Sequence, residues 1–126
     1  MNRTLLTILL LALTCSAASR ATTQSPDEER RAAITLLRAV NTAEAAINHS
    51  GHYVALPELI EHPSMARVKP NIVMSGSAVT YQGAQLRLAL SADAKQYVVT
   101  VVTGAPNYTA AFSDEGGLIY TGKALE

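Results

Sequence analysis

The sequence is poor in the residues that carry thiol chemistry and base stacking. It has one cysteine, one phenylalanine and no tryptophan, and its ten basic residues balance its ten acidic ones. No long run of one charge occurs, so the chain lacks the basic footprint of a nucleic-acid-binding protein and an acidic tail for a basic partner. Few aromatic side chains are present to stack on bases. We therefore predict that nucleic acid is not a partner.

The N-terminal segment has a pattern typical of a secretory signal. Arg3 precedes an apolar run from Leu5 to Leu13, and small residues follow that run. The run is shorter than the roughly 20 residues that a membrane-spanning helix needs. We expect signal cleavage after Ala21, with Ala18 as the alternative site. The expected product is a secreted or periplasmic protein with no membrane span in its mature chain.

Cleavage at the favoured site divides the chain into a signal peptide over residues 1–21 and a single domain over residues 22–126. The loss of Arg3 and Arg20 leaves eight basic and ten acidic residues, a net charge of −2. Cys15 leaves with the signal, which excludes a disulfide framework, a thiol nucleophile and a Cys-ligated metal. The alternative is a lipoprotein tethered through Cys15, although the residues before it fit the lipoprotein pattern poorly.

A long helix is predicted from Ser25 to about Asn48. Ser25 and Glu28 form a capping box, and Pro26 suits the first helical position because its missing N–H would have no partner there. Gly51 follows the expected helix end. Between these limits apolar residues recur at steps of three and four, which builds one apolar stripe. The stripe consists of Ala33, Leu36, Leu37, Val40, Ala43 and Ile47.

The hydrophobic period changes to two in the C-terminal half, which predicts strands. Residues 85–90 alternate, 97–102 are strongly β-branched, and 108–112 and 118–120 follow with short turns between them. Residues 64–83 carry no clear pattern, although 79–81 suit a first strand. Short turns require antiparallel neighbours, because a parallel crossover needs a dozen or more residues. The predicted fold is α+β, with one long helix packed on a meander of three or four antiparallel strands.

Several segments resemble the globular head of type IV pilin-like proteins and pseudopilins. They are residues 37–44, 51–53, 56–59, 97–99 with 105–106, and 112–119. The resemblance covers roughly residues 30 to 121 and implies the same helix-on-sheet head. One departure matters, because a mature pilin begins with a long apolar helix that anchors it in the membrane and packs in the filament core. This chain has a short signal and a charged helix start instead, so we expect an exported pilin-head-like module.

The histidines are the best candidates for a metal site. His49 and His52 form a His-x-x-His pair, and Glu58 and His62 follow within a few residues. Imidazoles and carboxylates are zinc ligands, so a small periplasmic metal-binding protein or a hydrolase is the alternative function. The spacing is poor support for it, because His49 lies at a helix end, where a histidine is also favoured electrostatically. We expect no metal and no cofactor.

No catalytic set is assembled by the remaining motifs. Ser75-Gly76-Ser77 lacks the strand-to-helix context of a nucleophile elbow. Asp114-Glu115 precedes two glycines in an expected tight turn, where Asp serves the local backbone. No helix follows those glycines, so a phosphate site is not expected either. We predict that the protein is not an enzyme.

The strand over residues 97–102 suggests a binding surface. Both of its faces carry apolar residues, yet one helix can cover only one face of a sheet. Val98 and Val102 share a face and are the candidates for an exposed apolar patch. We predict that this patch serves self-association or the binding of another envelope protein. The expected function is that of an exported, non-enzymatic interaction or structural module.

Overall fold

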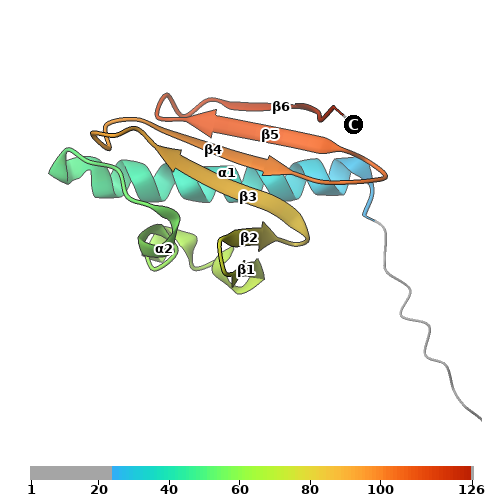
Figure 1. Ribbon diagram of the computed structural model, residues 1–126, viewed down its shortest axis with the longest axis horizontal. Helices are drawn as coiled ribbons and strands as arrows, with labels where there is room; N and C mark the ends of the chain where they lie inside the picture. Colours follow the sequence, from blue (N-terminus) through green and yellow to red (C-terminus); the bar gives the residue numbers. More distant parts are fainter. Residues whose placement is uncertain (1–23, 126) are drawn as a thin grey trace, which may run out of the picture.

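The fold is described by a computed structural model, which covers residues 24–125. The predicted signal peptide, its cleavage at Ala21 or Ala18 and the lipidation of Cys15 lie outside the described residues. Figure 1 shows the elements in chain order. The helical elements are α1 (Pro26–Ile47), η1 (Asn48–Ser50), α2 (Leu56–Leu59), η2 (Pro63–Met65) and η3 (Lys69–Asn71), where η marks a 3₁₀ turn. The strands are β1 (Ile72–Ser75), β2 (Ala78–Tyr81), β3 (Ala84–Leu90), β4 (Tyr97–Val102), β5 (Thr109–Asp114) and β6 (Ile119–Lys123).

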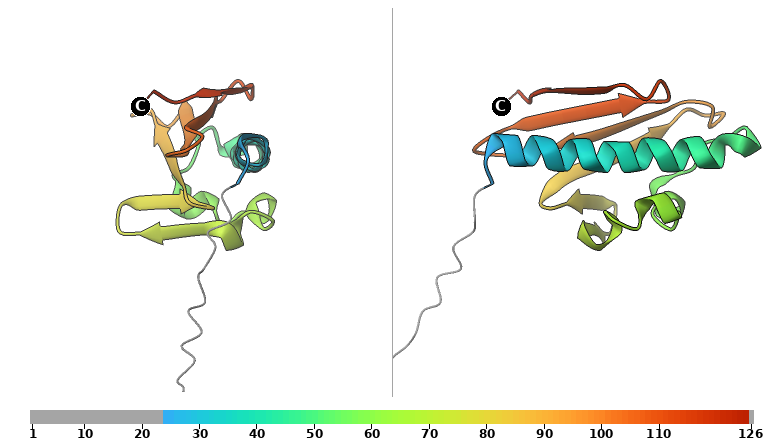
Figure 2. Two further views of the ribbon diagram at one scale, coloured as in Figure 1. Left: turned by 90° about the vertical axis from the view of Figure 1, so that its right-hand side faces the viewer. Right: turned by 180° about the vertical axis from the view of Figure 1, so that it is seen from behind.

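Helix α1 begins and ends as the sequence predicts. The Ser25 hydroxyl accepts from the Glu28 amide at 3.2 Å, and the Glu28 carboxylate accepts from the Ser25 amide at 2.9 Å. These two bonds satisfy donors that a helix start leaves unpaired. At the other end the 3₁₀ turn η1 follows, and Gly51 closes it with φ of +88°, a conformation that glycine adopts without strain. The helix runs along the whole sheet (Figure 2, right).

Within residues 24–125 the sheet has six strands in the order β1-β2-β3-β4-β5-β6, and all neighbours are antiparallel. The α+β class, the long helix and the antiparallel meander are confirmed. The prediction of three or four strands is wrong. The strand that was not predicted is β1, which pairs with β2 in a hairpin over residues 72–81 and in which Val73 and Met74 are exposed. A strand with no buried face shows no alternation of apolar and polar residues, so the sequence did not reveal β1.

The core lies between α1 and the middle strands. The apolar stripe of α1 is fully buried at Leu36, Leu37 and Val40, and it faces inward-pointing residues of β3, β4 and β5. Burying one such aliphatic side chain stabilises the fold by about 1.5–3 kcal/mol. The segment between α1 and β1 closes one side of this core. It contributes Leu56, Leu59, Met65 and Val68.

The two sides of the sheet differ in what covers them. Seen along the strands, α1 lies on one side of the sheet, and the β1–β2 hairpin extends toward the opposite side (Figure 2, left). The face of β3, β4, β5 and β6 that points away from α1 is called the open face below. Within the described chain no helix lies over it (Figure 1).

Candidate functional site

Val98 and Val102, which the sequence analysis predicts to form an exposed apolar patch, lie on the open face. In β4 the residues alternate, so Tyr97, Val99 and Val101 are buried against the helix while Val98 and Val102 point the other way. Val98 is 46% exposed and Val102 is 36% exposed. The structure therefore places both side chains together on the uncovered side of the sheet.

Two aromatic residues extend this surface, and sequence reasoning missed them. Phe112 in β5 is 47% exposed and pairs directly with Tyr120 in β6, which is 48% exposed. Their rings stack with centroids 4.9 Å apart and planes 17° apart. Aromatic pairs of this kind dominate the energetics of many interfaces. The alternation of β5 carried the signal for Phe112, but the register that places Tyr120 beside it came only with the structure.

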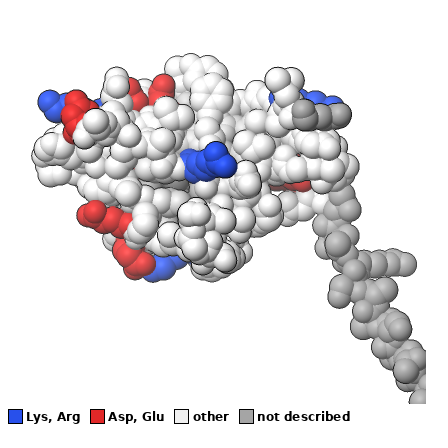
Figure 3. Space-filling view, viewed as in Figure 1, with Lys and Arg blue, Asp and Glu red and all other residues white. Residues whose placement is uncertain are grey.

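The open face has little charge. In the described strands β3, β4, β5 and β6, one basic residue and one acidic residue point to this side. They are Arg87 on β3 and Asp114 on β5. The two ion pairs within residues 24–125 join Arg30 to Asp27 and Lys69 to Glu61. Arg87 and Asp114 therefore have no salt-bridge partner among the described residues. The space-filling view of this side shows a largely uncharged surface with basic atoms near its centre (Figure 3).

A groove deepens the open face where the β1–β2 hairpin leaves the sheet. Its volume is about 520 Å³, and apolar side chains make up most of its wall. Met74 and Val79 come from the hairpin, Leu56 and Pro57 from α2, and Arg87 from β3. The groove is therefore an apolar recess with a single cation at its side.

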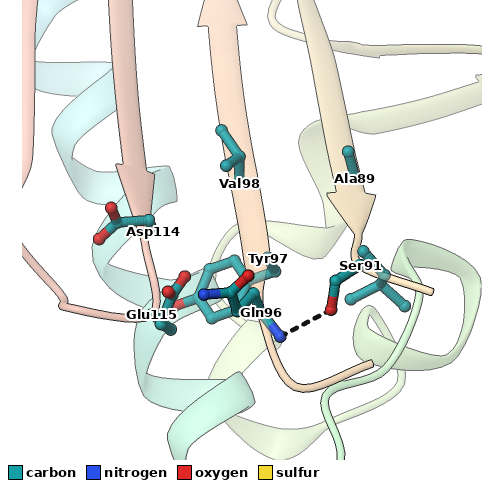
Figure 4. A pocket seen from close by; sticks show the side chains of 8 residues that line it. Ala89, Ser91, Gln96, Tyr97, Val98, Asp114 and Glu115 are labelled. Carbon is teal, nitrogen blue, oxygen red and sulfur yellow. Dashed lines mark hydrogen bonds between the residues drawn. The ribbon is translucent and has the colours of Figure 1, made fainter. Parts of the chain in front are cut away.

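A second recess, of about 310 Å³, shares Ala89 with this groove and lies where β3 ends, β4 begins and β5 ends. Figure 4 shows Ala89 and Val98 on neighbouring strands, with Asp114 and Glu115 on the opposite wall. The Asp114 carboxylate accepts from the Gly116 amide at 2.9 Å, which confirms the tight turn expected there. Ala89, Val98 and Asp114 also belong to the open face, so this recess is its continuation.

The histidine candidates are not gathered into a site. His49 lies in η1, His52 in the loop that follows, and Glu58 in α2. Nδ1 of His62 accepts from the Ser64 amide at 3.1 Å and so caps the 3₁₀ turn η2. Residues 24–125 contain no group of three or more His, Cys, Asp or Glu side chains that is arranged to hold a metal ion.

A buried chain of polar contacts joins α1 to the covered face of the sheet, and no local pattern in the sequence predicts it. The Tyr97 hydroxyl donates to Asn41 Oδ1 at 2.7 Å, and Asn41 Nδ2 donates to the Ser113 hydroxyl at 2.8 Å. Ser113 in turn donates to the carbonyl of Leu118 at 2.7 Å. Burial, followed by the charge of nearby Glu44, raises the pKa of Tyr97. This hydroxyl therefore stays protonated and acts as a donor.

Glu44 is a fully buried carboxyl group on the same helix. Its Oε2 accepts from the Val54 amide at 3.0 Å, while Oε1 has no hydrogen-bond partner among the described residues. Burial raises the pKa of Glu44, the Val54 hydrogen bond opposes that shift, and the charge of Glu58 adds to it. Glu44 thus fastens the loop after α1 to the helix.

Comparisons with protein-family models, with curated proteins and with solved structures find no match to this chain. The resemblance to pilin heads stays a prediction from the sequence. Among the described helices, none combines the length and the apolar character needed to cross a membrane.

Proposed function

We propose that the chain is an exported, non-enzymatic module of the cell envelope that resembles a pilin head and binds protein through its open face. The observation that carries this proposal is the exposure of Val98, Val102, Phe112 and Tyr120 on one uncovered side of the sheet. Isolated exposed apolar residues are ordinary, but a contiguous group on one face is typical of an interaction site.

The chemistry of the face favours protein over other partners. Its apolar centre carries few charges, and aromatic residues with one arginine match the composition of interface cores. Nucleic acid would require a cluster of basic side chains, and Arg87 is the sole base on this side of β3 to β6 in the described chain. Export is supported by the N-terminal sequence pattern.

Site-specific cross-linking in living cells tests the proposal. A photoreactive residue replaces Val98 in one strain and Arg38, an exposed residue of α1, in a control strain. We expect a discrete cross-linked species, identified by mass spectrometry, from position 98 and not from position 38. Adding Val102→Lys to the first strain should abolish that species, because a charge in the apolar patch opposes burial of the surface. Equal cross-linking at both positions would refute a specific role for the open face.

A further inference from the structure

Within β3, β4, β5 and β6 the open face has two charges, which have opposite signs and lie on opposite sides of β4, and Glu115 lies just beyond β5 in the second recess. Arg87 is on β3, and Asp114 is on β5. The other side chains that point to this side of β3, β4, β5 and β6 are uncharged. They are Gln85, Ala89, Val98, Thr100, Val102, Ala110, Phe112 and Tyr120.

We propose that the open face binds a second copy of the same chain, face to face, with the two-fold axis running along β4. This inference rests on the proposed function and names its partner. In a two-fold interface every contact between two different residues occurs twice, once in each direction, so the surface must be complementary to itself. Rotation about β4 places β3 of each copy over β5 of the other, and so brings each Arg87 toward Asp114 of the second copy. An axis across the strands would instead place Arg87 near its own counterpart.

The strand register adds a second match. Arg87 pairs with Thr100, Thr100 with Phe112, and Phe112 with Tyr120, so these residues form one row across the sheet. This row runs across β4, and a rotation about an axis along β4 leaves its position along the strand direction unchanged. Arg87 therefore comes opposite Phe112 of the second copy, where a guanidinium on an aromatic face is favourable. Asp114 lies two residues further along β5, about 7 Å away, which an arginine side chain can span.

The groove at the hairpin fits the same arrangement. β2 lies two strands from β4 on one side, and β6 lies two strands from β4 on the other. Rotation about β4 thus brings β6 of the second copy to the groove lined by Met74 and Val79. Two stacked sheets lie about 10 Å apart. The β1–β2 hairpin, which extends from its own sheet on this side, can therefore lie beside the edge strand β6 of the second copy. Tyr120, which ends the cross-strand row, is then the side chain nearest the groove.

The area of the face sets the strength of association that we expect. Four strands about 4.8 Å apart and about 20 Å long give a flat footprint of roughly 400 Å² per copy. Stable complexes bury about 800 Å² per partner. The dimer should therefore be weak and depend on protein concentration, with the hairpin contacts adding to the sheet contact.

Charge reversal in analytical ultracentrifugation tests the inference on the purified exported chain over a concentration series. Arg87→Glu alone and Asp114→Arg alone should each weaken the dimer by about tenfold or more, because each places like charges together. The double variant Arg87→Glu with Asp114→Arg should return to within about threefold of the wild type. Arg38→Glu on exposed α1 is the matched control and should change nothing. Circular dichroism melting verifies that each variant is folded.

The outcomes separate this inference from the proposed function. A wild-type chain that stays monomeric at every concentration overturns the second copy as partner, and so does a dimer that charge reversal leaves unchanged. If the chain is monomeric while position 98 cross-links to a different envelope protein, the inference fails and the proposed function stands. If position 98 cross-links to nothing and the chain is monomeric, both fail.

Discussion

The two faces of the sheet are built from similar residues and yet have different environments. In β4 the covered face has Tyr97, Val99 and Val101, and the open face has Val98, Thr100 and Val102. Val99 is fully buried, while Val98 next to it is 46% exposed. β-branched residues suit a strand on either side, so the composition of the strand does not distinguish the faces. The position of α1 determines which face is buried, because the side that it covers becomes core and the other side is left available for a partner.

The largest difference in stability between variants of the two faces should come from shortening one buried side chain of the covered face. Leu86 on β3 is 2% exposed and packs in the core against α1. Leu86→Ala should lower the free energy of unfolding by about 2–5 kcal/mol, since it removes buried methyl groups and leaves a cavity. Val98→Ala on the open face is the comparison and should cost less than about 1 kcal/mol in dilute protein. Urea denaturation measures both, and equal losses would contradict the distinction between the faces.

A smaller effect is expected from the polar contacts of the covered face. Asn41→Ala removes the acceptor of the Tyr97 hydroxyl and one of two partners of the Ser113 hydroxyl, which still donates to the Leu118 carbonyl. Leaving the buried Tyr97 hydroxyl without an acceptor costs about 1–3 kcal/mol. The neighbouring Thr42 is exposed, and its hydroxyl bonds only to the Arg38 carbonyl of its own helix. Thr42→Ala should therefore leave the free energy of unfolding within about 0.5 kcal/mol of the wild type. A free energy of unfolding for Asn41→Ala as close to the wild type as that of Thr42→Ala would contradict a contribution of the buried chain to stability.

Metal binding offers a test in which we expect no change. Calorimetric titration with zinc at micromolar concentration should give no binding heat, because His62 is used as a cap. His49→Ala is the matched variant, and it should behave as the wild type. Binding that His49→Ala abolishes would instead favour the metal-binding alternative.

Local signals in the sequence predicted the helix and the main strands. The capping box at Ser25 and Glu28 depends on neighbours in the chain, and so does the alternation around Leu86. The contacts that the sequence could not reveal join distant residues. Asn41 and Tyr97 are 56 positions apart, and Asn41 and Ser113 are 72 apart.

The candidate site was predicted in part for the same reason. Val98 and Val102 follow from one strand and the rule that one helix covers one face. Phe112 and Tyr120 needed the register between β5 and β6, and the groove needed a hairpin whose exposed residues hide its strand pattern. Glu44 was missed because a charged residue in a helix is normally assigned to the solvent side, whereas here it is fully buried.

A last, small effect on stability concerns pH and sharpens the contrast between a buried and an exposed carboxyl group. Burial raises the pKa of Glu44 above 4.5, so the folded state holds this proton more tightly than the unfolded state. Its contribution to stability is therefore complete below about pH 4.5 and is lost as the pH rises through the folded-state pKa. Glu58 and the Tyr97 hydroxyl face the same region, and the charge of Glu58 raises the pKa of Glu44 further.

Glu44→Gln should remove this dependence, because glutamine carries no proton to lose and its carbonyl can still accept from the Val54 amide. Urea denaturation from pH 4.5 to 8 should show the variant gaining stability relative to the wild type as the pH rises. Asp93 is the matched control, because its pKa is lowered by hydrogen bonds from the Ser91 hydroxyl and the Lys95 amide at an exposed turn. Asp93→Asn should lose stability relative to the wild type as the pH rises through about 3.8, below this window, so its profile should run nearly parallel to that of the wild type from pH 4.5 to 8. Parallel pH profiles for the wild type and Glu44→Gln would mean that Glu44 titrates in the folded protein as it does in the unfolded chain.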